Sequence, residues 1–220
     1  MKLITLLFLL IPFIYFSQDK TKSKIFINEI LLSVNKSSST ENKMGNYGYG
    51  LGVNRSFNKR KRLNFVLGVH YNQTSQFNKS LSHGGLYHEN EVTHIFHNVS
   101  VPLSLRINLL ESKLLFAELG GFIDVMLPTT RKYIAKGYVD DNSRFVYSPQ
   151  EIKDFVWFRG LHPGIQFGVG SIFNVKKQIF IAKADFKFSL NDLNNAYRAS
   201  NSLRNNYFQL SLGYRIISID

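Results

Sequence analysis

Apolar and polar side chains alternate strictly along residues 207–216, near the end of the chain. The apolar positions are Phe208, Leu210, Leu212, Tyr214 and Ile216, and the polar or small positions are Gln209, Ser211, Gly213 and Arg215. Successive side chains of a β-strand point to opposite faces, so this segment is predicted to be a strand with one apolar and one polar face.

Similar alternation recurs along the chain and predicts eight strands. They are expected at 25–34, 47–55, 63–71, 93–109, 113–127, 163–173, 179–190 and 207–216. The connections between them alternate between long and short, as they do in outer-membrane barrels. The sequence therefore predicts an all-β fold, an eight-stranded antiparallel up-and-down transmembrane β-barrel. The last strand is expected to pair with both the first and the seventh. Pro102 cannot donate to a ladder, so a bulge or a gap in pairing is expected there.

The polar faces of these strands carry charges of both signs. These residues are Arg106, Glu118, Asp124, Lys183, Asp185, Lys187 and Arg215. Opposite charges can pair across a narrow lumen, and the glycines and serines on the same faces suit the tight interior of a small barrel. We therefore expect these seven residues to form a lumen charge network, with the apolar faces toward lipid. The alternative is a soluble lipocalin-like barrel with its apolar face inward.

The N-terminus resembles an export signal. Lys2 precedes an apolar run that ends near Phe16, too short to span a bilayer comfortably. We expect residues 1–17 to be a signal peptide cleaved before Gln18, residues 18–24 to be a polar lead-in, and residues 25–220 to be the barrel domain. A buried helix of the mature protein is the alternative for residues 1–17. The expected location is the outer membrane of a Gram-negative cell.

The chain has a net charge of +12 and no cysteine. The missing cysteines exclude disulfides, thiolate metal sites and a cysteine nucleophile. Because an exported protein rarely meets nucleic acid, the basic charge is better explained by attraction to anionic lipid head groups. We expect outer-membrane lipids, including anionic lipopolysaccharide, and the barrel-assembly machinery as partners, and no nucleic acid.

One group of histidines could hold a metal ion. His83, His88, His94 and His97 lie close together in sequence, with Glu89 and Glu91 among them. Their spacing matches no compact zinc or copper site, so a solvated outer loop is the better interpretation. His97 and Ser100 are three apart on a strand and face opposite sides, so they cannot form a catalytic pair. We expect no enzyme activity, no metal and no cofactor.

The connection at 128–162 is the best candidate for partner binding. Residues 140–143 are typical of a hairpin turn, which leaves a ten-stranded barrel as the alternative architecture. Residues 148–151 match a helix capping box, which predicts a short helix as far as Phe155. The aromatic candidates for partner contact are Tyr133, Tyr138, Phe155, Trp157 and Phe158. Alternatively, these aromatic residues belong to the outer girdle of the barrel.

The chain resembles a known family of outer-membrane proteins. The features that carry the resemblance are the Ser17-Gln18 end of the signal segment, the strand at 97–106, the glycine-rich 118–122 and the final Leu-Gly-Tyr-Arg of residues 212–215. They are similar to the PorT-like barrels of Bacteroidetes-type bacteria, some of which are implicated in type IX secretion and gliding-related export. The C-terminus departs from the usual pattern, because it continues to Asp220 instead of ending on an aromatic residue.

Two functions remain open from the sequence. The first is a non-enzymatic barrel that supports an envelope or secretion complex through its outer loops. The second is a small passive channel or a ligand-binding barrel.

Overall fold

The computed structural model describes residues 27–37, 43–57, 62–82, 88–109, 114–136, 138–139, 145–146, 150–156, 158, 160–176, 178–191, 193 and 204–216. The expected signal peptide and polar lead-in lie outside these ranges. The strands are β1 (Glu29–Ser37), β2 (Lys43–Phe57), β3 (Leu63–Ser82), β4 (His88–Asn108), β5 (Leu115–Met126), β6 (Thr129–Lys136), β7 (Tyr138–Val139), β8 (Phe145–Val146), β9 (Gln150–Val156), β10 (Leu161–Val175), β11 (Gln178–Ser189) and β12 (Tyr207–Arg215). Within the described part of the chain, no helix is long and apolar enough to cross a membrane.

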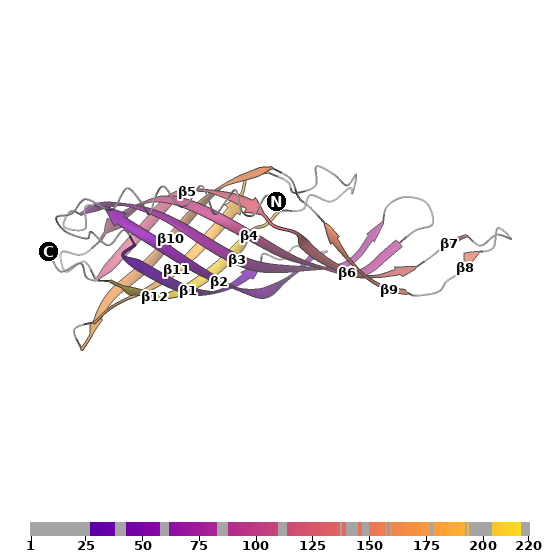
Figure 1. Cartoon of the computed structure of the whole chain (residues 1–220), viewed down its shortest axis with the longest axis horizontal. Coiled ribbons are helices and arrows are strands. Elements are labelled where there is room, and N and C mark those ends of the chain that lie inside the picture. Colours follow the sequence, from indigo (N-terminus) through magenta and orange to yellow (C-terminus); the bar gives the residue numbers. More distant parts are fainter. Residues whose placement is uncertain are drawn as a thin grey trace, which may run out of the picture.

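Eight of these strands form a closed antiparallel barrel (Figure 1). Their order is β3-β2-β1-β12-β11-β10-β5-β4, and β4 pairs back onto β3. β12 pairs with β1 from Glu29↔Arg215 to Ser37↔Tyr207, and with β11 on its other side. The eight-stranded barrel and both partners of the last strand are therefore as the sequence predicts.

The barrel wall is apolar on the outside and polar on the inside. Leu32 is 65% exposed, Leu119 66% and Val169 60%, whereas Ser100 is 0% and Arg106 1% exposed. A soluble lipocalin-like barrel would show the reverse, so that alternative is wrong. Rings also pack side by side on the outer wall of β10–β12, as in the Phe186–Phe208 pair at 4.8 Å between centroids.

The longest strands run past the barrel. The residues following Tyr71 and preceding Thr93, expected to be a polar loop, instead extend β3 and β4 along one register to Ser82↔His88. β4 pairs with β5 at its C-terminal part and with β6 from His88 to Ile95. Its long protruding part lies with β6 and β9 beyond the barrel in Figure 1, and β7 and β8 lie farther out still. We call the outer sheet β6, β9, residues 74–82 of β3 and residues 88–97 of β4.

The ten-stranded alternative is not what the structure shows. β6 and β9 join the sheet only through β4, outside the ring, so the closed barrel keeps eight strands. The short helix expected to run as far as Phe155 is also wrong, because β9 occupies this segment and pairs with β6 from Thr129↔Val156 to Ala135↔Gln150. The capping-box signal is local, and pairing along a whole strand outweighs it. The expected hairpin is present as β7–β8.

Irregularities occur where the sequence or the backbone requires them. At Pro102 the β3–β4 ladder has no partners for Gly68 and Val69, and the register is the same on both sides of this gap. The register of β4 against β6 shifts between Asn90 and Thr93, where Glu91 has a φ of 54°. A left-handed residue of this kind produces a β-bulge, and it lies where β4 has left the barrel.

Candidate functional site

A chain of alternating charges crosses the lumen near the turn end, which is the end with the β2–β3, β4–β5 and β10–β11 connections. Its members, in order of contact, are Arg215, Glu29, Arg106, Glu118, Lys183 and Asp185. Glu29 is on β1 and Arg106 is on β4, and β2 and β3 separate these strands in the ring. Their ion pair therefore spans the lumen, and we call this set the ion chain.

Arg106 is the central member of the ion chain. Its guanidinium donates to Glu29 Oε1 at 2.6 Å and Oε2 at 3.0 Å, and its Nε donates to Glu118 Oε1 at 2.5 Å. The guanidinium carbon also lies 4.4 Å from the ring centroid of Phe116. A planar guanidinium suits two carboxylates at once, because its donors point in fixed directions. Arg106 is 1% exposed, so these contacts replace water for the charge.

Lys183, on β11, is the next member of the ion chain after Glu118. Its Nζ donates to Glu118 Oε2 at 2.9 Å and lies 3.1 Å from Asp185 Oδ2. Gly168 faces Asp185 across the β10–β11 ladder, and a Cβ at that position would overlap the Asp185 carboxylate. Gly168 is thus required for room rather than for backbone conformation.

Lys187 and Asp124 lie in the lumen without joining the ion chain. Lys187 Nζ and Asp124 Oδ1 have no hydrogen-bond partner within the described residues. The Lys187 ammonium lies 5.5 Å from the ring centroids of both Phe122 and Tyr207. The sequence predicts seven lumen charges. Five of them belong to the ion chain, in which Glu29 links Arg215 to Arg106, and Lys187 and Asp124 do not belong to it.

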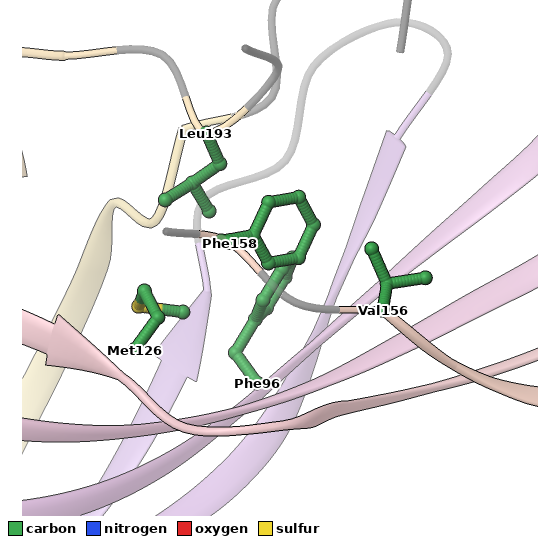
Figure 2. Close-up of a cluster of buried hydrophobic side chains, with 5 residues drawn as sticks. All are labelled: Phe96, Met126, Val156, Phe158 and Leu193. Carbon is green, nitrogen blue, oxygen red and sulfur yellow. The ribbon is translucent and has the colours of Figure 1, made fainter. Parts of the chain in front are cut away.

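At the opposite, loop end of the lumen, apolar side chains form a buried cluster (Figure 2). The buried cluster consists of Phe96, Met126, Val156, Phe158 and Leu193. Phe96 and Met126 are on the inward faces of β4 and β5, and Figure 2 shows Phe158 and Leu193 meeting them from segments outside the barrel strands. Phe96 and Phe158 rings lie 5.8 Å apart. We call these five residues the mouth cluster.

The segment before β12 is fastened across the same mouth. Thr74 Oγ1 donates to Asn205 Oδ1 at 2.7 Å, and Gln76 Nε2 donates to the Arg204 carbonyl at 2.8 Å. The Ser189 amide donates to Asn206 Oδ1 at 2.8 Å. Thr74 and Gln76 are on β3, so these bonds tie the segment to the wall opposite β11. These bonds and the mouth cluster therefore lie at the same end of the lumen.

The five aromatic candidates for partner contact do not form one surface. Tyr133 is buried against Val92, Phe158 belongs to the mouth cluster, and Phe155 is 66% exposed on β9. The side chain of Tyr138 and the whole of Trp157 lie outside the described residues. Only Phe155 is therefore placed by the structure where an outside partner could contact it.

Of the four histidines, His94 and His97 have described side chains, and these lie on opposite faces of β4. His94 is buried, and half-buried His97 is on the outer wall, where its Nδ1 lies 2.7 Å from Tyr71 Oη. His83 and the side chain of His88 lie outside the described residues. Over the residues that are described, no group of three histidine or carboxylate side chains could hold a metal ion.

Glu29 of the ion chain and most members of the mouth cluster are not among the site residues predicted from the sequence. Glu29 has the inward alternation of Leu31 and Ser33, so extending the pattern of the first strand would have found it. Phe96 and Met126 are apolar residues at inward positions, where the other strands carry mostly polar side chains. This exception to the alternation indicates an apolar cluster at the mouth of the lumen. Leu193 lies in a segment without periodicity and offers no such signal.

Comparisons with known proteins find likenesses among solved structures alone. No family model matches the chain, and no curated protein matches it. The Yersinia pestis attachment invasion locus protein Ail, in complex with the heparin analogue sucrose octasulfate, is 14% identical with a TM-score of 0.38, covering 86% of this chain and 97% of that one. Outer membrane protein Ail in a phospholipid bilayer nanodisc is 17% identical with a TM-score of 0.36, covering 86% and 99%. The N-terminal β-barrel domain of Pseudomonas aeruginosa OprF is 9% identical with a TM-score of 0.32, covering 86% and 98%. These likenesses are too distant to support a functional conclusion.

Proposed function

We propose that this chain is an integral outer-membrane β-barrel with a non-enzymatic role, in which a closed barrel anchors the outer sheet and the outer sheet binds a partner in the cell envelope. A secretion complex is the partner that the PorT-like resemblance implies. Membership of that family, the signal peptide at 1–17 and insertion by the barrel-assembly machinery are parts of the same proposal.

The continuity of β4 is the observation that carries this proposal. One strand of 21 residues pairs with β5 in the barrel and with β6 outside it. The outer sheet is therefore a direct extension of the barrel wall rather than a loop attached to it. Loops that merely connect barrel strands have no need of a paired sheet, whereas a binding platform gains from a fixed orientation.

The outer wall supports a membrane location. Its exposed apolar side chains form the lipid-facing surface of an inside-out barrel, and every backbone edge of the ring is paired. The net charge of +12 favours contact with anionic lipid, including lipopolysaccharide.

A small passive channel or a ligand-binding barrel is the alternative function. The ion chain and the mouth cluster both argue against a passage, because one crosses the lumen and the other covers its mouth. An enzymatic role finds no support either, since His97 and Ser100 lie on opposite faces of the wall.

A pull-down from native membranes in mild detergent tests the proposal. Residues 129–156 would be replaced by a short Gly-Ser linker, which removes β6, β7, β8 and β9 and leaves the eight barrel strands. A matched control would carry a Gly-Ser replacement of residues 110–113 at the turn end. Heat-modifiable gel mobility would verify that both variants fold.

We expect the intact protein and the turn-end control to retain the same co-purifying envelope protein, and the 129–156 variant to lose it. Retention by the 129–156 variant, or no partner with any of the three proteins, would contradict the proposal.

A further inference from the structure

The outer sheet ends in a strand with one unpaired edge. All seven residues of β9 pair with β6, from Ala135↔Gln150 to Thr129↔Val156. The sheet order stops at β9, and no other described strand pairs with its second edge. An unpaired edge presents a row of backbone N–H and C=O groups that another chain can extend.

The outer sheet holds this edge in place. Ile152 packs against the buried pair Val92 and Tyr133. Asp154 accepts two hydrogen bonds from Arg131, at 3.0 and 2.6 Å. β9 is thus fixed from one face and along one edge, so a partner strand would meet a backbone that is already extended.

The other face of β9 carries a defined pattern. Glu151 and Lys153 are exposed, and Phe155 is 66% exposed. Charged residues on an edge strand usually prevent unselective pairing. Two neighbouring charges of opposite sign also favour a strand with the complementary order, because like charges directly opposite are destabilising.

A second copy of this chain fits the edge poorly. β9 runs along the long axis of the molecule (Figure 1), so two copies in one membrane would bring their β9 strands together in parallel. A symmetric parallel pair in register places Glu151 opposite Glu151 and Lys153 opposite Lys153. Both contacts repel, which leaves a strand from another protein as the better occupant.

We propose that the free edge of β9 binds an extended peptide strand of the partner protein in antiparallel orientation. The partner strand carries an apolar residue opposite Phe155, a carboxylate opposite Lys153 and a basic residue opposite Glu151. Read from its N-terminus, it has the pattern apolar–x–acid–x–base. Antiparallel pairing continues the arrangement of the outer sheet and is slightly more stable per residue than parallel pairing. This inference rests on the proposed function and specifies how the partner binds.

Tethered peptide competition tests the pattern. The chain has no cysteine, so Phe155→Cys would give a unique attachment point on β9 in the full-length barrel. Two peptides of identical composition, Thr-Cys-Thr-Glu-Thr-Lys-Thr and Thr-Cys-Thr-Lys-Thr-Glu-Thr, would compete for it in a glutathione redox buffer. Mass spectrometry would measure the ratio of the two mixed disulfides, and tethering makes even a weak preference measurable.

The expected result is a preference of about tenfold for the acid-then-base peptide, from two cross-strand charge pairs that change from unfavourable to favourable. Adding Glu151→Lys with Lys153→Glu should reverse the preference, and both residues are exposed, so the fold should not change. N-methylation of one alternate set of amides in the favoured peptide should abolish its advantage, whereas methylation of the other set should not.

Equal capture of the two peptides, or a preference that the charge exchange does not reverse, would overturn the inference. Partner loss on replacing residues 129–156 would still support the proposed function in that case. If the variant that lacks residues 129–156 retains the partner, the proposed function is contradicted, whichever peptide is preferred. Failure of the inference and failure of the proposed function are therefore distinguishable.

Discussion

At the turn end the lumen is crossed by charges, whereas at the loop end it is covered by apolar side chains. The ion chain uses residues on five barrel strands whose registers fix their positions. The mouth cluster joins β4, β5 and β9 to Phe158 and Leu193, which lie outside the strands. The difference matters for energetics, because breaking an ion pair leaves a buried charge whereas trimming an apolar contact leaves only a cavity.

The largest effect is expected at the centre of the ion chain. Arg106→Met would leave Glu29 and Glu118 as buried carboxylates with one cation each and no connection between them. We predict a loss of about 4 kcal/mol in the free energy of unfolding, in the range measured for buried pairs that lose one partner. Urea unfolding in detergent micelles, followed by heat-modifiable gel mobility, would measure it.

A charge-balanced variant sharpens this result. Arg106→Met combined with Glu118→Gln removes one charge of each sign and leaves the Arg215–Glu29 and Lys183–Asp185 pairs intact, so most of the lost stability should return. If the double variant is as unstable as Arg106→Met alone, packing rather than charge is the main contribution of Arg106.

Two lysines on one strand give the next contrast. Lys183 has two carboxylate partners, whereas Lys187 has no hydrogen-bond partner within the described residues. We predict that Lys183→Met lowers the free energy of unfolding by about 3 kcal/mol, since it leaves Asp185 unpaired. Lys187→Met should cost less than about 1 kcal/mol, because no hydrogen bond is lost. Equal losses in the same unfolding assay would contradict the division of lumen charges described above.

The mouth cluster should respond more mildly. Leu193→Ala removes a buried apolar side chain and leaves a cavity, so we predict a loss of about 2 kcal/mol, at the low end for buried leucine. Limited proteolysis should also show faster cleavage after this change. Leu190→Ala is a matched control, because Leu190 is 55% exposed, and it should leave both measurements almost unchanged.

The smallest effect is expected in the outer sheet. The Arg131–Asp154 pair is partly exposed, with the Asp154 side chain at 35%. Asp154→Asn should lower global stability by no more than about 1 kcal/mol, as is usual for ion pairs that water can reach. Hydrogen exchange should nevertheless rise in β9 and not in β12. A global loss comparable to that of Arg106→Met would mean that the outer sheet and the barrel unfold as one unit.

The same contrast explains which parts of the molecule are predictable from sequence. Arg106, Glu118 and Lys183 could be assigned to the lumen because a strand has a period of two and these residues lie opposite leucines, valines and alanines. The partners of each charge depend on register across the lumen, which alternation does not encode. The pairing of Glu29 with Arg106 therefore cannot be predicted from the sequence, although the inward position of Glu29 can.

Outside the barrel, sequence patterns are weaker. The residues beyond Tyr71 and before Thr93 are polar, so hydropathy predicted a loop where β3 and β4 continue as paired strands. At β9 the local capping-box signal predicted a helix, and pairing with β6 decides otherwise. Leu193 gave no signal because its burial depends on segments brought together only by the closed barrel.

Electrical recording from the purified protein in a planar lipid bilayer tests the central claim most directly. Because ion pairs cross the lumen at the turn end and the mouth cluster lies at the loop end, we predict no stable unitary current from the intact protein, from Arg106→Met, or from a Phe158→Ser and Leu193→Ser variant that disrupts the mouth cluster alone. Current is expected only when the ion chain and the mouth cluster are both disrupted in one molecule. Stable unitary currents from the intact protein would contradict a closed anchor and favour the passive channel.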